Sequence, residues 1–281
     1  MPLTRVIAAV ALLVMFAGAA AGQQATPWSV GHKSKARLIV GSMPGPSGGA
    51  LLYAGVEIAL EKDWKTYWRH PGDAGGVPPY FDWSKSRNLK QATVSFPAPH
   101  RFVEQLGDSI GYKSRLVLPI AIEPQVAGRK IGLAVELQYG VCREICIPAQ
   151  AKLALEFDPV QLRTMPPQLA VALDNVPRDA RQRSQRSPRL LRLDAKLDGS
   201  QPKLVIDVAF PDGTGEADLF VEAGSDLYLP MPRTVKALGD NEVRYEIDLS
   251  KNIDVKALRG RQLRLTMVSA RQNAEVVHKL P

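Results

Sequence analysis

Cysteine and histidine are scarce in this sequence, and that scarcity limits the chemistry of the chain. Among 281 residues there are two cysteines and four histidines, the latter scattered at His32, His70, His100 and His278. A structural zinc site needs four ligands, and a cysteine protease needs a histidine beside its thiol. The spacing supplies neither, so we predict no metal site and no cofactor. A metal-handling protein that uses only the two thiols stays open as an alternative.

Long apolar runs are missing after the first 22 residues. A membrane-spanning helix needs about 20 apolar residues, so we expect no stable membrane insertion of the mature chain. Within the first 22 residues, Arg5 precedes an apolar stretch from Val6 to Ala21, which ends in a run of small residues typical of a signal-peptidase site. We interpret residues 1–22 as a signal peptide, with a membrane anchor as the alternative, and expect a periplasmic protein.

The net charge of +8 raises the question of nucleic-acid binding. Much of the excess lies in one run that is interrupted by Asp, Gln, Ser and Pro, a composition typical of a solvated linker. An exported protein also meets little nucleic acid, so we predict no nucleic-acid partner. The run consists of Arg178, Arg181, Arg183, Arg186, Arg189 and Arg192.

Short apolar segments punctuated by glycine and proline predict an all-β fold. In residues 51–60, apolar side chains fall on alternate positions, which is typical of a half-buried antiparallel strand. An aromatic, turn-rich block occupies residues 64–83. Many short strands without a convincing long helix indicate a β-sandwich. In this part of the chain we expect strands at 36–40, 51–60, 91–96, 115–122, 130–139 and 151–157.

The stretch from 159 to 188 separates two β-rich regions. It contains five prolines beside the arginines, and only residues 168–175 suggest a short helical turn. Strand signals resume at 190–193, 203–209, 217–222, 243–249 and 261–270. We therefore predict a sandwich at residues 23–158, a Pro/Arg-rich linker at 159–188 and a second, smaller sandwich at 189–281. The second region has no cysteine and suggests no chemistry of its own.

Cys142 and Cys146 lie between two clearly alternating segments, 131–139 and 151–157. Four extended residue steps span about 13 Å, whereas a disulfide needs Cα atoms about 4.4–6.8 Å apart. The three residues between the cysteines must therefore form a turn if the bond closes.

Two interpretations of the pair compete. A disulfide that closes so small a loop stabilises a fold by only about 2 kcal/mol, which favours a reversible redox pair over a structural bond. The structural bond stays open, and with it the interpretation of the chain as a non-catalytic β-sandwich adaptor or binding protein. Between the cysteines, the positive charge of Arg143 would favour a thiolate, whereas the negative charge of Glu144 would oppose it.

Five blocks of sequence occur in a recognisable order: DWKTYWRHPGD (63–73), PPYFDW (78–83), GYK (111–113), LVLP (116–119) and YGVCREICIP (139–148). Together they resemble the periplasmic N-terminal domain of the DsbD and ScsB thiol–disulfide reductases. The resemblance covers about residues 36–157, and the Cys-x-x-x-Cys spacing is closer to the ScsB-like branch.

The resemblance implies an immunoglobulin-like sandwich that passes electrons to periplasmic proteins. We accordingly expect two consecutive immunoglobulin-like sandwiches, a protein-disulfide reductase type of activity and a link to cytochrome c biogenesis. Reductases of this family continue into a membrane domain and a thioredoxin-like domain, and these 281 residues show neither. The expected partners are therefore a separate membrane thiol reductase and thioredoxin-like periplasmic proteins.

The resemblance also assigns roles to particular residues. Cys146 would attack the partner disulfide and Cys142 would resolve the mixed disulfide. A loop at about 100–111 would cover the pair with Phe102 or Leu106. Other aromatics are expected in the core or at its rim, and Trp68 and Tyr139 are expected to help shield the pair.

Overall fold

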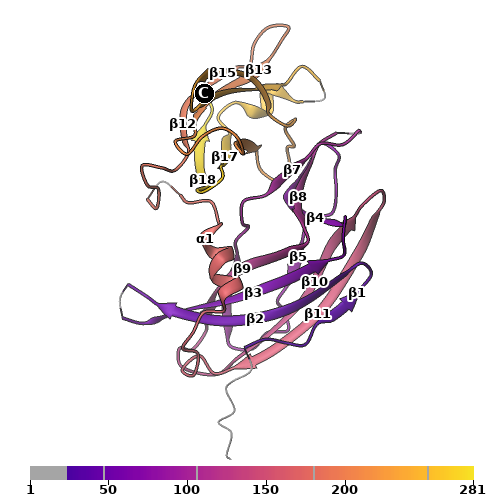
Figure 1. Cartoon of the computed structure of the whole chain (residues 1–281), viewed down its shortest axis with the longest axis vertical. Coiled ribbons are helices and arrows are strands. Elements are labelled where there is room, and N and C mark those ends of the chain that lie inside the picture. The colour runs from indigo at the N-terminus through magenta and orange to yellow at the C-terminus, as the bar shows by residue number, and fades with distance from the viewer. Residues whose placement is uncertain (1–23, 47, 106, 180, 252) are drawn as a thin grey trace, which may run out of the picture.

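A computed structural model describes residues 24–46, 48–105, 107–179, 181–251 and 253–281. Nearly all regular structure in these residues is β-strand, as the sequence predicts (Figure 1). None of the described helices is long and apolar enough to cross a membrane. The signal-peptide interpretation concerns residues 1–22, which lie outside the described residues.

The N-terminal half of the chain, residues 24–158, contains two antiparallel sheets. The first sheet has the order β1-β2-β3-β9-β6, and the second has the order β11-β10-β4-β8-β7 with β5 paired to β10. The first consists of β1 (Ser29–Gly31), β2 (Ser34–Pro44), β3 (Ala50–Leu60), β9 (Arg115–Pro124) and β6 (Leu89–Val94). The second consists of β11 (Cys146–Phe157), β10 (Ile131–Cys142), β4 (Lys65–Gly72), β8 (Ser109–Lys113), β7 (His100–Phe102) and β5 (Tyr80–Asp82).

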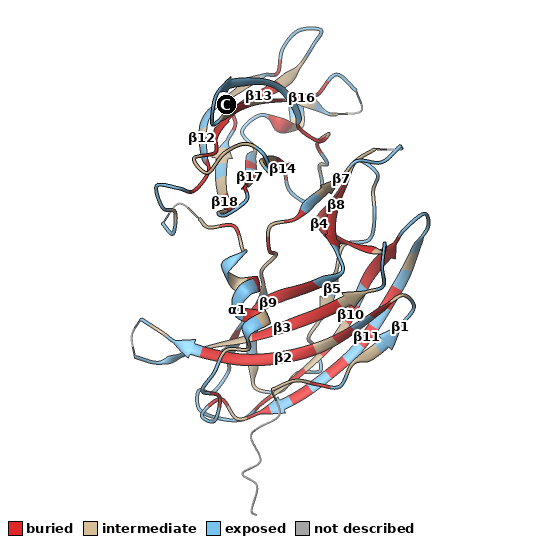
Figure 2. Ribbon diagram, in the orientation of Figure 1, coloured by how far each residue is buried: buried red, intermediate tan, exposed pale blue. Residues whose placement is uncertain are grey.

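These two sheets pack face to face, and the alternating side chains of their strands form the core between them. The predicted apolar faces are the buried ones: Ala54, Val56 and Ile58 on β3 are fully buried. Along β11, buried and exposed positions alternate, as Figure 2 shows. Such alternation is what a strand with one face on the core requires.

The predicted linker contains the short helix α1 (Pro167–Asp174), close to the expected helical turn. The helix packs on the outer face of the first sheet, where Leu169 is buried against Ile39 and Val117. Gly55 makes this contact close: a Cβ there would lie 3.0 Å from the Leu169 side chain. Part of the Pro/Arg-rich stretch is therefore firmly packed.

The C-terminal half, residues 189–281, contains two further sheets around a separate apolar cluster. The larger sheet consists of β12 (Arg189–Lys196), β13 (Lys203–Ala209), β16 (Glu242–Asp248) and β15 (Arg233–Gly239) in that order. The smaller consists of β14 (Asp218–Glu222), β17 (Gln262–Val268) and β18 (Ala274–Lys279), and a 3-10 helix η1 (Val255–Leu258) precedes β17. This half lies beside the ends of β7 and β8 (Figure 1).

Several strands were not anticipated from the sequence. The most consequential is β4, which lies inside the aromatic, turn-rich block. Seven of its eight positions are buried, including Lys65, Thr66 and His70. Because polar residues occupy buried positions on both faces, β4 lacks the period-2 pattern by which half-buried strands are recognised.

Candidate functional site

The two cysteines end the long hairpin formed by β10 and β11. The ladder runs without a break from Ile131 opposite Phe157 to Cys142 opposite Cys146. Residues 143–145 form the predicted turn, and the cysteines are joined by a disulfide with a Cα–Cα distance of 4.1 Å. The alternating apolar residues that turn one face of each hairpin strand to the core also fix the register of the two strands. That register places the two cysteines opposite each other.

The two cysteines differ in exposure. Cys142 is 1% exposed, whereas Cys146 belongs to the exposed residues of the hairpin tip. The neighbouring Ile145 is 67% exposed, which is unusual for a large apolar side chain. A large partner can thus reach Cys146 and contact Ile145, while Cys142 is accessible chiefly from Cys146 itself.

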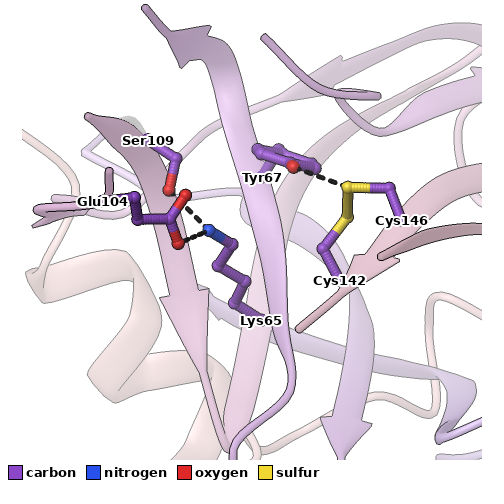
Figure 3. Close-up of a disulfide and its surroundings, with 6 residues drawn as sticks. All are labelled: Lys65, Tyr67, Glu104, Ser109, Cys142 and Cys146. Atoms are coloured by element: carbon purple, nitrogen blue, oxygen red, sulfur yellow. Dashed lines mark hydrogen bonds and ion pairs between the residues drawn. A yellow bond between two sulfur atoms is a disulfide. The ribbon is translucent and has the colours of Figure 1, made fainter. Parts of the chain in front are cut away.

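Tyr67 on β4 contacts the exposed cysteine. Its hydroxyl lies 2.9 Å from the Cys146 Sγ (Figure 3), and since a disulfide sulfur carries no hydrogen, the O–H donates. Tyr67 is only 3% exposed. Burial, and secondarily the charge of Glu104, raise the pKa of Tyr67 above its ordinary value, so the phenol keeps its proton. Tyr67 is thus a fixed hydrogen-bond donor beside the reactive sulfur.

A buried lysine lies next to this donor. Lys65 pairs with Cys142 in the sheet, and its Nζ donates to Ser109 Oγ at 2.7 Å and to a carboxylate oxygen of Glu104. Lys65 is 5% exposed, so its ammonium depends on these two partners. Figure 3 shows Lys65, Glu104 and Ser109 on one side of Tyr67 and the disulfide on the other.

The structure describes one of the two proposed cap residues, Phe102. Phe102 on β7 is half-buried, and its ring centre lies 5.7 Å from Lys65 Nζ and 4.7 Å from Lys113 Nζ. It therefore belongs to the surroundings of the lysine that neighbours Cys142. Leu106 lies outside the described residues.

The structure does not bring Trp68 and Tyr139 to the disulfide. Tyr139 is three positions from Cys142 on the same strand and so faces the opposite side, where its hydroxyl bonds Ser34 Oγ at 2.8 Å. Trp68 points away from Tyr67 into the core, where it is fully buried against Phe220. The resemblance suggested their shielding role, but strand alternation places both side chains on the core face.

The charged residues of the turn have little influence on the site. Arg143 and Glu144 are both exposed and lie 3.9 Å apart. Exposed opposite charges at this distance largely cancel and are screened by salt. The polar environment of the disulfide is therefore set by β4 rather than by the turn itself. No sequence signal marked Tyr67 as the contact, since it depends on how β4 and β10 pair.

Comparisons with known proteins agree with the resemblance noted in the sequence. Residues 51–158 match the family described as "Thiol:disulfide interchange protein DsbD, N-terminal". No curated protein matches the chain. Among solved structures, the crystal structure of the N-terminal periplasmic domain of ScsB from Proteus mirabilis is similar, with a TM-score of 0.66 and 18% sequence identity. The match covers 92% of this chain and 98% of that one.

The solved structure matches nearly the whole chain, so the likeness of fold includes the C-terminal half as well as the half that carries the cysteines. At 18% sequence identity, this likeness is evidence for the fold alone. The family match lies on the segment that contains β4, the hairpin and both cysteines. The expected resemblance is thereby confirmed: residues 51–158 are a DsbD N-terminal-like domain, in a chain folded like the periplasmic domain of ScsB.

Proposed function

We propose that this protein is a periplasmic thiol–disulfide exchange module that acts through Cys142 and Cys146. The observation that carries the proposal is the asymmetry of the pair. The sulfur of exposed Cys146 has a fixed donor in Tyr67, and Cys142 is buried behind it. A disulfide that served stability alone would have no need of this arrangement. The family match supports the same function, and thiol–disulfide exchange needs only the two cysteines as reactive residues.

The exchange would proceed in two steps. In the reduced protein, the Cys146 thiolate attacks one sulfur of a partner disulfide; a new S–S bond forms and the other partner sulfur leaves as a thiolate. Cys142, having lost its proton to solvent, then attacks the Cys146 sulfur. This reforms the intramolecular disulfide and releases the second partner sulfur as a thiolate. Two electrons pass to the partner, and a separate thiol reductase must return them.

Tyr67 would favour the first step. Exchange needs a deprotonated, accessible sulfur. Because burial holds the pKa of Tyr67 above its ordinary value, its O–H is available to hydrogen-bond the Cys146 thiolate. A hydrogen bond to the charged form lowers the pKa of the thiol. Tyr67 would therefore raise the fraction of Cys146 that is reactive at neutral pH.

The proposed partners follow from the chemistry and from the family. A thioredoxin-like periplasmic protein would dock its own exposed cysteines at the hairpin tip, where Ile145 offers an apolar contact. A membrane thiol reductase would supply the electrons. Both would use the same sulfur, since only one of the two cysteines is exposed.

Trapping of mixed disulfides tests this proposal. Cys142→Ser removes the resolving thiol, so that variant should accumulate mixed disulfides with thioredoxin-like periplasmic proteins. Cys146→Ser should trap far fewer, because its remaining thiol is buried. Equal trapping would contradict the roles assigned to the two cysteines. If neither variant traps a partner and both stay folded, the bond is structural and the chain is better explained as a non-catalytic adaptor.

The redox equilibrium gives an independent measurement. The reduction potential of the couple should lie in the range of exchanging pairs, about −270 to −120 mV. A value below about −300 mV is typical of a structural disulfide and would contradict the proposal. Equilibration of the purified full chain with glutathione and thioredoxin buffers measures it directly.

A further inference from the structure

Strand β4 connects the disulfide site with the C-terminal half of the chain. Lys65, Thr66 and Tyr67 pair regularly with β8, and regular pairing stops there. The next paired residue is Gly72, so residues 68–71 bulge out of the ladder. The bulge thus begins immediately after Tyr67, which contacts the Cys146 sulfur.

Side chains of the bulge contact the C-terminal half. Arg69 donates to Glu222 on β14 at 2.7 Å and to Glu275 on β18 at 2.5 Å. The three side chains are 22%, 15% and 20% exposed, so the ion pairs are largely shielded from solvent. Beside them, the ring of Trp68 packs against Phe220 with a centroid distance of 5.6 Å.

Charge compensation makes Arg69 important for this contact. Burial opposes its charged form, but hydrogen bonds and charges from Glu222 and Glu275 outweigh the burial and raise the pKa of Arg69. Removing one member of a shielded ion-pair network leaves uncompensated charge behind. Arg69 therefore holds the bulge of β4 to two strands of the C-terminal half.

The chain beyond the bulge is held by the same half. Asp73 accepts a hydrogen bond from the backbone N–H of Met231 at 3.0 Å. Met231 and Phe220 also join the apolar core of the N-terminal half, so the contact is continuous with that core. Both ends of the bulge are thus fixed by the C-terminal half.

The loop that follows Asp73 covers Tyr67. The backbone of Gly76 lies so close to the phenol ring that a Cβ there would approach it to 2.4 Å. The carbonyl of Val77 accepts from the N–H of Gly140, two residues before Cys142. The position of the Tyr67 ring is therefore determined by β4 on one side and by this loop on the other.

From these contacts we infer that the C-terminal half is a positioning element for the thiol site. By holding Arg69 and Asp73, it fixes the strand and the loop that place the Tyr67 hydroxyl against Cys146. Arg69 and Asp73 are positioning residues, since they act on the sulfur only through Tyr67. The inference deepens the proposed function and rests on it for its biological consequence. The effect of the C-terminal half on Cys146 can itself be measured in the purified protein.

Alkylation of Cys146 in the full chain tests this inference. In a Cys142→Ser background, the rate of reaction with iodoacetamide as a function of pH gives the pKa and reactivity of the Cys146 thiol. Arg69→Gln should slow alkylation at pH 7 by about threefold or more, because a displaced Tyr67 no longer hydrogen-bonds the thiolate. In a protein that also carries Tyr67→Phe, Arg69→Gln should have no further effect, since coupled residues are not additive.

A matched control separates positioning from general destabilisation. Arg244 pairs with Asp207 inside the C-terminal half, through two hydrogen bonds of 2.7 Å. Arg244→Gln should lower stability without changing the alkylation profile. If Arg69→Gln prevents folding, Asp73→Ala tests the same idea at a more exposed position, because it removes the acceptor for Met231.

Two results would overturn the inference. One is an unchanged alkylation profile in folded Arg69→Gln and Asp73→Ala. The other is an equal slowing by Arg69→Gln with and without the Tyr67 hydroxyl. Failure of the proposed function is distinguishable, because it shows as absent trapping and a reduction potential in the range of structural disulfides. Alkylation uses no partner protein and is unaffected by that outcome.

Discussion

The Tyr67 hydroxyl and the Cys146 Sγ meet at 2.9 Å although 79 positions separate the two residues in the sequence. The contact forms because β4 pairs with the end of β10, where Lys65 lies opposite Cys142. Two residues further along β4, Tyr67 reaches the cysteine on the other strand of the hairpin. The sheet thus gives each cysteine a different neighbour: a lysine for the buried one and a phenol for the exposed one.

Removing the Tyr67 hydroxyl should make Cys146 less reactive. Tyr67→Phe keeps the buried ring but eliminates the donor, which is worth about 1.5–3 kcal/mol to a charged acceptor. We expect the pKa of the Cys146 thiol to rise by about one to two units and alkylation at pH 7 to slow by about tenfold or more. Tyr139→Phe is the matched control, because that hydroxyl bonds Ser34 on the other face of β10. Equal effects from both variants would contradict the assignment.

Adjacent glycines in the loop over Tyr67 offer a second comparison. Gly75 and Gly76 both have positive φ angles, +71° and +155°, so alanine is strained at either position. At Gly75 the added Cβ meets open space, whereas at Gly76 it collides with the Tyr67 ring. Gly75→Ala should lose about 1–2 kcal/mol of stability. Gly76→Ala should lose more, because of the collision, and it alone should also slow alkylation of Cys146. Indistinguishable alkylation rates would show that the ring is not held by this loop.

The sequence was most informative where one face of a strand covers a core. Alternating apolar residues predicted β3, β10 and β11, and in the structure the expected faces of these strands are buried. The turn between the cysteines followed from a different argument: four extended residue steps span about 13 Å, too far for a disulfide, so the chain between the cysteines must turn if the bond closes. Local periodicity is enough to predict such strands, because the sequence of the strand itself determines which of its side chains face the core.

The contacts of β4 could not be predicted from the local sequence pattern. Lys65 can be buried because Glu104 compensates its charge and Ser109 accepts a hydrogen bond from it, and both residues come from a distant part of the chain. The register of β4 against β10 decides that Tyr67, rather than Trp68, faces the cysteines. Register between strands far apart in sequence is fixed by the assembled core, so the pattern of β4 alone contains no information about it.

Lys65 should contribute to stability through its hydrogen bond to Ser109, whose side chain is fully buried. Lys65→Met removes the ammonium and leaves the Ser109 hydroxyl without this partner, so we expect the free energy of unfolding to fall by about 1–3 kcal/mol. Lys85 pairs with Glu136 on the surface, and Lys85→Met should cost less than about 1 kcal/mol. Urea unfolding of the two variants measures the difference. A smaller loss in Lys65→Met than in Lys85→Met would contradict this account.

We propose that residues 23–158 and 189–281 are separate domains joined by the stretch 159–188. Each half has its own sheets and apolar cluster, and Arg181 and Arg186 in the connecting stretch are exposed. Limited trypsin digestion should therefore cut first between about residues 181 and 186. The fragments should stay associated at low and at high salt, because the ion pairs of Arg69 are shielded from solvent and Phe220 and Met231 are buried in the core of the other half. An earlier cut inside either half would contradict the boundary.

Acidification should weaken the junction between the halves through His70. Its Nδ1 accepts from the N–H of Gly72 at 3.2 Å, and its ring packs against Tyr228 of the C-terminal half at 4.8 Å. Burial lowers the pKa of His70, and the nearby charge of Arg69 acts in the same direction, while Glu222 and Asp73 oppose it. The folded protein therefore keeps this imidazole neutral, which the accepted hydrogen bond requires.

The sign of the pH effect follows from this preference. Unfolded histidine gains a proton below about pH 6.5, whereas folded His70 resists protonation, so the unfolded state binds more protons. The stability from His70 is thus fully present above pH 6.5 and is lost as the pH falls, by at most about 1.4 kcal/mol per pH unit. His70→Phe should reduce the loss of stability between pH 7.5 and 5.5 in urea unfolding. An unaltered slope in His70→Phe would assign the pH dependence to other groups.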